Sequence, residues 1–432
     1  MRRSALFRAA ALATLLLFAV SCASTQLPPI SSQGRSFVPL RDEERLWAQS
    51  RAEEEKLLGE VKLYGDPGLE SYLDEVVGRL NPPAMASNPA IHYRVRVVED
   101  PTLNAFAYPH GSIYVHTGLL ARMEDEDELA TVLGHEMTHV EYRHMLRYQR
   151  SEHNKAVGLS VAAFTAAVVL AVAEGNAADH GHWATAEALD VFGHVMVDLG
   201  LQLAFQASVN GYGRGLEEEA DMGGFGKLAA AGYDLHEAPK VYQALLEDQG
   251  DTRKAEAFFF GSHPRLSERI AVTKKYVAQH SGGKLSGDRA DREDAFARHI
   301  RPVVRDDARL NIEMGRLALA EAELKRVRDW MPQDPETHFL KGRLRLAQAA
   351  GSSPEEARGL RREAEDSFRK AIELDADLPA PHRELGLLLR DREDFRGACV
   401  QLRRYQKLAP DAEDGEEVGG IIEGLERGGG CG

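Results

Sequence analysis

The chain has 432 residues, of which 43% are hydrophobic and 28% are charged, so it is long enough for two or three globular domains. Its formal net charge is −15 at pH 7. Binding to phosphate groups requires a basic surface, and the sequence contains neither a basic stripe nor a glycine-rich phosphate loop. The composition therefore argues against nucleic acid as the main partner.

Residues 1–21 have the pattern of an export signal rather than of a folded segment. Three arginines precede an apolar run at 9–20, which is too short and too alanine-rich to predict a membrane span. Small residues then precede Cys22, as in a bacterial lipoprotein signal, although Ala19 stands where leucine is more common. An ordinary signal peptide that is cleaved nearby is the alternative. We expect export, lipid attachment at Cys22, and a tether at 22–40.

The next part of the chain predicts helices and a small sheet. Apolar periodicity predicts helices over Arg41–Leu63 and Leu69–Leu80, the second of which ends before two prolines. Alternating residues predict a strand over Ile91–Val98. Asn104–Ala107 and Ser112–His116 predict a β-hairpin around a Pro-His-Gly turn.

The most informative motif is Leu-Gly-His-Glu-Met-Thr-His, which ends at His139. The acidic run Glu124–Glu128 suits a helix N-terminus, and no Pro or Gly interrupts Val140–Arg150, so we expect an uninterrupted helix. On a helix, His135 and His139 share a face and can bind one metal ion, with Glu136 beside them. This is the His-Glu-x-x-His arrangement of a zinc hydrolase. The alternative is an amphipathic helix that carries two histidines by chance.

An uncharged stretch follows at Ala156–Ala173, and its 18 residues raise the question of a membrane span. The next helical segment, Ala184–Val209, carries acidic residues and cannot return the chain across a bilayer. A single span would therefore separate the two histidines from every later ligand. We expect a buried or interfacial alanine-rich helix instead.

The second half of the chain predicts further helices and then a repeat. Helices are expected over Leu216–Ala231 and Glu237–Leu246 and from Arg269 to Ala278, followed by a linker at 281–305. Small and large apolar residues then recur at a spacing of 34, which is typical of tetratricopeptide repeats. The middle repeat has ten extra residues, which we place between its two helices at Ala350–Gly359.

Three helix pairs from about Ala308 to Pro410 are expected to form a short solenoid, within a repeat region at 306–410. The alternative is an irregular helical domain. Residues 411–432 are polar and rich in glycine and are expected to form a flexible tail.

A catalytic zinc site needs a third protein ligand and an open position for water. Glu217 and Asp221 are one helical turn apart, so Glu217 can bind the metal while Asp221 accepts the outer N–H of a ligand histidine. Spacing alone leaves other third ligands open. These are Glu218, Glu219, His153, His180, His182 and His194.

Several segments together resemble one peptidase family. The segment from Glu217 to Asp221 is similar to the Glu-x-x-x-Asp segment of the zinc metallopeptidases that include the CAAX prenyl protease, HtpX, Oma and BepA. Asn104–Leu120 resembles the hairpin of that family, and His139–His144 resembles its extended metal helix. Ala230–Asp234 and Ser262-His263-Pro264 with Arg269 match later landmarks. Two departures are His110 and the pair Gly223-Gly224, where the family usually has Gly and bulkier residues.

The resemblance implies a mainly α fold of the α+β type. We expect a zincin-type metalloprotease domain with a small β-sheet at 41–280, followed by an all-α tetratricopeptide-repeat solenoid. It also implies one Zn²⁺ per chain, held by His135, His139 and Glu217 and supported by Asp221. Glu136 then serves as the general base for attack by the zinc-activated water.

Three further residues or segments have expected roles. The strand Ser112–His116 (Ser112, Ile113, Tyr114, Val115 and His116), if it lies at a sheet edge, would pair with extended substrate backbone. His144 lies five residues after His139, off the ligand face of a continuous helix, and is expected to be structural. His263 precedes Pro264 and is therefore extended. In BepA-like members the matching histidine resembles a plug that fills the fourth zinc position. Its alternatives are an oxyanion donor and a packed loop residue.

Two function classes remain open at this point. The first is a periplasmic protease, lipid-anchored to the outer membrane, that degrades misfolded or stalled envelope proteins. The second is a chaperone or assembly factor that binds client proteins through its repeats, with secondary or latent proteolysis. Glu136 favours the first class because a pure scaffold does not need it. The repeats predict a docked protein partner in either case.

Overall fold

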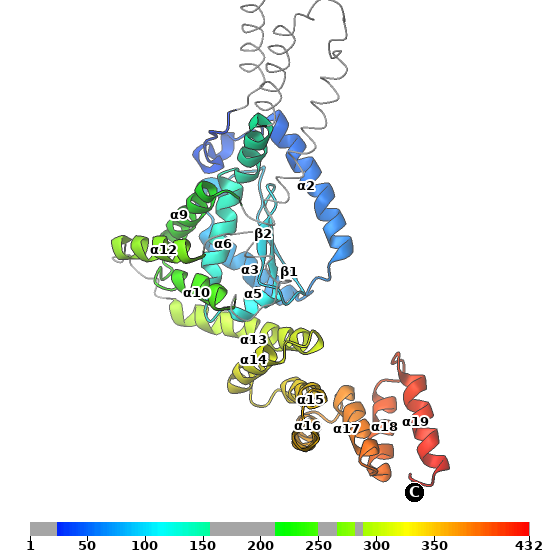
Figure 1. Ribbon diagram of the computed structural model, residues 1–432. Coiled ribbons are helices and arrows are strands. Elements are labelled where there is room, and N and C mark those ends of the chain that lie inside the picture. The colour runs from blue at the N-terminus through cyan, green and yellow to red at the C-terminus, as the bar shows by residue number, and fades with distance from the viewer. Residues whose placement is uncertain (1–23, 156–211, 249–265, 281–287, 432) are drawn as a thin grey trace, which may run out of the picture. The chain divides into compact units, whose positions relative to one another are not determined.

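The computed structural model describes residues 24–155, 212–248, 266–280 and 288–431 (Figure 1). The chain divides into two compact units. The first unit takes most of the chain up to Glu293, and the second runs from Asp294 to Gly432 and includes the short segments 99–101 and 120–122. The expected architecture is confirmed, because the described residues are mainly helical, contain one small sheet, and are all-helical in the C-terminal part.

The first unit contains helices before and after a three-stranded sheet. Its elements are α2 (Arg41–Glu60), α3 (Pro67–Leu80), α4 (Pro83–Ala86), β1 (Arg94–Val98), β2 (Ala105–Ala107), β3 (Ser112–His116), α5 (Thr117–Arg122), α6 (Glu126–Glu141), α9 (Arg214–Ala231), α10 (Ala238–Asp248) and α12 (Leu266–His280), preceded by two short 3-10 turns at Ile30–Ser32 and Gly34–Ser36. Local signals explain several of the helix ends. Asp66 caps α3 ahead of Pro67 by accepting from the amides of Gly68 and Leu69, and Gly232, at φ 76°, ends α9.

The sheet has the strand order β1-β3-β2, with β3 at its centre. β1 runs parallel to β3, and β2 runs antiparallel to β3 as the first arm of the expected hairpin. The turn of that hairpin needs Gly111, which has φ 108° and lies so close to the chain that a Cβ there would be 2.6 Å from the carbonyl oxygen of His92. His110, next to this glycine, does not disrupt the turn. Its ring lies beside Glu54 of α2, with His110 Nε2 and Glu54 Oε2 2.8 Å apart.

Helices α6 and α9 pack directly against each other, and α6 also contacts β2 (Figure 1). Glycines allow the close approach of the two helices. A Cβ at Gly224 would lie 3.1 Å from the amide nitrogen of His135, and a Cβ at Gly223 would lie 2.4 Å from the Cγ2 methyl of Thr138. The glycine pair that departs from the usual family sequence is therefore the point where α9 crosses the metal-motif helix.

The second unit is built from consecutive helices. They are α13 (Arg289–Glu313), whose first residues belong to the first unit, α14 (Leu317–Trp330), α15 (Pro335–Ala350), α16 (Pro354–Leu374), α17 (Pro379–Asp391), α18 (Phe395–Leu408) and α19 (Gly415–Arg427). α15 packs on α16 and α17 packs on α18. A Cβ at Gly342 would lie 2.3 Å from the Phe368 ring, and a Cβ at Gly386 would lie 2.7 Å from Leu402. The small and large residues of the repeat thus face each other within each pair.

Three expectations for this region differ from the structure. The ten extra residues of the middle repeat do not form a long loop, because only a short turn separates α15 from Pro354, and the insertion instead lengthens α16 to 21 residues. Residues 289–305 of the expected linker are helical and belong to α13. The expected flexible tail contains α19, which buries Val418 and Ile422 against Leu402 and Tyr405.

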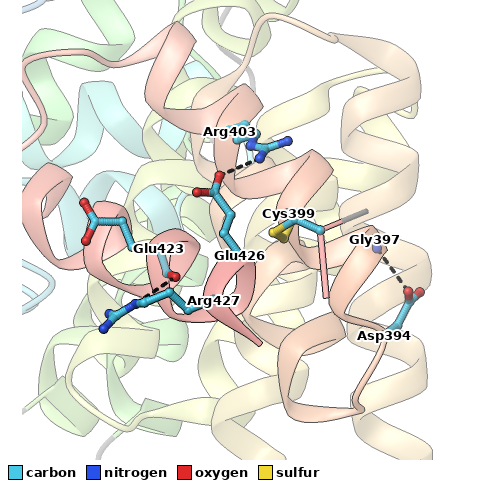
Figure 2. Close-up of a disulfide and its surroundings, with 8 residues drawn as sticks. Asp394, Gly397, Cys399, Arg403, Glu423, Glu426 and Arg427 are labelled. Carbon is cyan, nitrogen blue, oxygen red and sulfur yellow. Dashed lines mark hydrogen bonds and ion pairs between the residues drawn. A yellow bond between two sulfur atoms is a disulfide. The ribbon is translucent and has the colours of Figure 1, made fainter. Parts of the chain in front are cut away.

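A disulfide between Cys399 in α18 and Cys431 fastens the segment after α19 to the preceding helix (Figure 2). Arg403 of α18 also forms an ion pair of 2.5 Å with Glu426 of α19. Both contacts explain why a glycine-rich sequence is ordered there.

In the part of the chain that the structure describes, every helix is too short or too polar to cross a lipid bilayer. The uncharged stretch Ala156–Ala173 and the leader with Cys22 lie outside the described residues. The interpretation of both segments stays a prediction.

Candidate metal centre

The metal motif lies in the middle of α6, and this helix is buried along its whole length. Its N-terminus is capped by Asp125, which accepts a hydrogen bond of 2.9 Å from the amide of Glu128. Three acidic residues in the first turn suit the positive end of the helix dipole. His135, Glu136 and His139 are each no more than 4% exposed. The helix therefore presents the motif inside the protein rather than on its surface.

Glu217, near the N-terminus of α9, completes a convergent group with the two histidines. Nε2 of His135 and Nε2 of His139 are 2.9 Å apart, and they lie 3.5 Å and 3.8 Å from the carboxylate oxygens of Glu217. One potential ligand atom from each residue falls within 4.8 Å of the others, and all three residues are buried. Two imidazole nitrogens and one carboxylate oxygen form a donor set that suits Zn²⁺ and leaves a fourth position for water.

Asp221, one turn after Glu217, holds the outer nitrogen of His135. Its Oδ1 lies 2.9 Å from Nδ1 of that ring. Arg269 of α12 grips the same carboxylate through two nitrogens, at 3.0 and 2.6 Å, and Tyr242 of α10 donates to it at 2.9 Å. Burial alone would raise the pKa of Asp221, but Arg269 and the hydrogen bond from His135 outweigh burial and lower it to about 2. Asp221 is therefore an ionised acceptor that fixes the His135 ring.

His139 has a different outer partner, which the sequence argument placed wrongly. The expected continuous helix is broken at Tyr142 and Arg143, and a new helix runs from 144 to 155. Arg143 has φ 59°, a left-handed conformation that is uncommon outside glycine. This break turns the fully buried His144 back toward the site, so that its Nδ1 lies 2.8 Å from Nδ1 of His139.

The other residues considered as third ligands lie elsewhere or outside the described residues. Glu218 is exposed, and Glu219 is engaged by Arg147 through two hydrogen bonds of 2.5 and 3.0 Å. His153 lies on the 144–155 helix and is not part of the convergent group. The remaining candidates, His180, His182 and His194, lie outside the described residues, as does the plug residue His263. The role of His263 stays a prediction.

The expected role of Ser112–His116 depended on a position at a sheet edge, and the structure does not meet that condition. β3, formed by Ser112–His116, is the central strand and is paired along both sides. Its backbone groups already bond to β1 and β2, so it has no free edge for an extended peptide. The order of strands follows from a parallel β1–β3 pairing that spans the β2 segment, and the sequence carries no signal for that pairing.

The sequence did not predict the residues that contact the metal ligands, or the partner of a ligand, from other parts of the chain. Arg269 was visible only as a landmark and had no assigned role, whereas the structure places it on Asp221 with its guanidinium 4.2 Å from the Tyr242 ring centroid. Tyr212 packs on His139, with ring centroids 4.7 Å apart, and its amide donates to Glu217 at 2.9 Å. No local pattern distinguishes these tyrosines from ordinary core residues.

A helix with His-Glu-x-x-His, a glutamate from a second helix and a small mixed sheet together define a metallopeptidase domain. Comparison with known proteins agrees with this class. Residues 67–277 match Peptidase family M48.

Named relatives share about a quarter to a third of the aligned residues. Mitochondrial metalloendopeptidase OMA1 of Schizosaccharomyces pombe is 29% identical over 260 residues, 58% of this chain and 66% of that protein. OMA1 of Arabidopsis thaliana is 33% identical over 179 residues, which cover 41% of this chain and 30% of that protein. The beta-barrel assembly-enhancing protease of Escherichia coli K12 is 25% identical over 224 residues, which cover 52% of this chain and 42% of that protein. This chain thus spans less than two thirds of the length of these relatives.

Proposed function

We propose that this protein is a zinc-dependent endopeptidase of the bacterial cell envelope that degrades misfolded or stalled envelope proteins. The observation that carries the proposal is the buried convergence of His135, His139 and Glu217 beside an intact Glu136. The named relatives support the reaction class. The beta-barrel assembly-enhancing protease among them supports a location in the cell envelope.

The residues of the chain divide the reaction between them. His135, His139 and Glu217 would hold the zinc ion, and a bound Zn²⁺ supplies an acidified water and polarises the scissile carbonyl. Glu136, next to the ligands on α6, accepts the proton of the attacking water and delivers it to the leaving amine. Asp221 keeps His135 in the tautomer whose Nε2 is free to bind metal.

We infer that an extended substrate pairs with the outer edge of β2, whose residues are buried in this structure and would have to be uncovered for pairing. The carbonyl of Asn104 accepts from the amide of His116, and the amide of Tyr108 donates to the carbonyl of Ser112. By the alternation of an antiparallel ladder, the backbone groups of Ala105 and Ala107 therefore point away from β3. β2 also contacts α6, which carries the catalytic motif. A peptide added to this edge would run near α6, and such pairing selects unfolded chains because folded ones rarely offer a free strand.

The proposed location is the periplasm, with a lipid on Cys22 anchoring the chain to the outer membrane. The leader supports export, and the bridge between Cys399 and Cys431 suits an oxidising compartment. Replacing Cys22 with Ser should move the mature protein from the membrane fraction to the soluble periplasm. Retention of that variant in the membrane fraction would refute the lipid anchor.

The deciding experiment compares wild type with Glu136→Gln. Both proteins should bind about one zinc ion per chain, whereas only wild type should cleave casein or an unfolded outer-membrane protein. Glutamine keeps the shape of the side chain but cannot accept the proton. A variant that loses its zinc would contradict the assigned roles, and a variant that still cleaves would contradict Glu136 as general base.

A second candidate function is client binding by the helical unit, and one groove favours it. Between α14 and α15, Lys325, Arg328, Lys341 and Arg345 surround an apolar floor of leucines. Glu321 neutralises Arg345 at 2.8 Å, which leaves a net positive groove on a chain whose formal charge is −15. Charge complementarity therefore selects an acidic, extended segment of a partner protein as its occupant.

This docking function is tested in the Glu136→Gln background, so that cleavage does not interfere. Lys325→Glu with Lys341→Glu should weaken the binding of a fluorescent acidic client peptide at least tenfold, and added salt should weaken binding to wild type. The matched control is Lys370→Glu, which changes a lysine of α16 outside the groove. Equal affinity of the double variant and the control would refute the groove as the docking site.

A further inference from the structure

The interruption of the helix after α6 indicates a role for a residue outside the metal motif. Resting on the proposed zinc site, we propose that His144 is a positioning residue that fixes the His139 ligand by accepting a hydrogen bond from its Nδ1–H. The ring of His144 is fully buried, and its Nδ1 lies 2.8 Å from Nδ1 of His139. His144 touches neither substrate nor the reacting atoms in this role.

The tautomers of the two rings follow from the geometry. Nε2 of His139 faces Nε2 of His135 at 2.9 Å, so Nε2 is the atom that His139 offers to a metal. Its Nδ1 must then carry the proton, and only an unprotonated Nδ1 of His144 can accept it. The remaining proton of His144 sits on Nε2, which faces Oε2 of Glu219 at 3.5 Å. Arg147 holds that carboxylate in place with two hydrogen bonds.

The two ligand histidines are therefore supported in parallel ways. His135 donates to a carboxylate that an arginine holds, and His139 donates to His144, which in turn faces a carboxylate that another arginine holds. A metal-bound histidine needs such a partner, because the partner fixes both the tautomer and the direction of the ring.

The backbone of Arg143 makes this contact possible. On an uninterrupted helix, residues five apart lie about 140° apart and do not face each other. The left-handed residue at 143 interrupts the helix, and His144 lies beside His139. Such a conformation is strained and persists only where its surroundings hold it. Here Glu43 of α2 forms a buried bidentate ion pair with Arg143, whose guanidinium also lies 5.5 Å from the Phe37 ring.

The test measures metal affinity rather than hydrolysis. His144→Leu removes the acceptor, and His144→Asn places an amide oxygen where Nδ1 was. We expect the leucine variant to bind Zn²⁺ about 10–100-fold more weakly in chelator competition, with a changed Co²⁺ absorption spectrum. We expect the asparagine variant to stay within a few-fold of wild type. His153→Leu, on the same helix but outside the site, is the matched control and should bind metal normally.

The outcomes separate this inference from the proposed function. Wild-type affinity in the leucine variant, or equal losses in the leucine and asparagine variants, would overturn the role of His144 while leaving the zinc site itself intact. A wild type that binds no zinc would instead overturn the proposed function. If His144→Leu does not fold, the zinc-loaded wild type still decides the question by NMR. A scalar coupling between ¹⁵Nδ1 of His139 and ¹⁵Nδ1 of His144 is expected, and its absence from assigned signals would refute the hydrogen bond.

Discussion

Replacing Gly223 with Ala should push apart the two helices that hold the metal ligands. A Cβ at this position would lie 2.4 Å from Cγ2 of Thr138, closer than side-chain carbons approach one another. Thr138 cannot rotate away without loss, because its hydroxyl donates to the carbonyl of Gly134 at 2.7 Å and accepts from Lys227 at 3.1 Å. The two helices, α6 and α9, must therefore move apart to relieve the clash.

The size of the effect follows from two opposing terms. Alanine is favoured over glycine inside a helix by about 1 kcal/mol. Overpacking a rigid contact costs roughly 1–3 kcal/mol. Gly226→Ala is the matched control, because a Cβ at Gly226 meets no atom within 4 Å and the substitution should stabilise the protein. The preference for alanine is common to both variants, so their free energies of unfolding should differ by the overpacking cost alone, roughly 1–3 kcal/mol, with Gly223→Ala the less stable.

Urea unfolding of the metal-free protein measures this difference, and chelator competition measures the accompanying loss of zinc affinity. Thr138→Ser removes the obstructing methyl group and keeps the hydroxyl, so it should restore part of the stability of Gly223→Ala. The double-mutant cycle therefore isolates the clash. Equal stability of Gly223→Ala and Gly226→Ala, or no coupling between positions 223 and 138, would refute the close crossing of the helices.

Three other measurements test separate parts of the structure. Glu217→Gln should lower the zinc content far more than Glu218→Gln, which changes an exposed neighbour; equal losses would show that Glu217 is not the third ligand. Burial, with help from nearby carboxylates, raises the pKa of Glu128 from 4.5 to about 8. The folded protein thus binds this proton more tightly than the unfolded chain, so the stabilisation is complete below pH 4.5 and is lost as the pH rises through 8. Glu128→Gln should flatten the dependence of the unfolding free energy on pH between 4.5 and 8, and an unchanged slope would refute this source. Cys431→Ser should lower the stability of the C-terminal helices by roughly 2–4 kcal/mol, because the bridge restrains the unfolded chain. Thermal unfolding with and without reductant measures this loss, and a reductant effect that persists in the variant would show that the bridge is not its cause.

The sequence was sufficient wherever a local period determines a structure. The four-residue spacing of His135 and His139 and the turn between Glu217 and Asp221 depend only on helix geometry. The repeat was visible because small residues such as Gly342 face large ones such as Phe368 at fixed distances along the chain. These positions came together as the spacing predicted.

The remaining features depend on contacts between distant residues, which leave no local signal. The left-handed Arg143 lacks the glycine or asparagine that marks such a break, and the partner that holds it, Glu43, lies 100 residues earlier. The central place of β3 likewise depends on a pairing with a strand that is not its hairpin neighbour. α19 did carry a signal, because Val418 and Ile422 are one turn apart, but its glycines obscured that signal.

The buried charges around α6 restrict how this sequence can change over evolutionary time. Each cation is almost completely enclosed and is matched to one carboxylate from another element. Losing one member of such a pair strands a charge inside the protein, at a cost of roughly 3–5 kcal/mol, whereas exchanging both members for packed apolar residues is often neutral. These positions should therefore drift in pairs, through joint substitutions rather than through single steps. The pairs are Arg143–Glu43 and Lys227–Glu141.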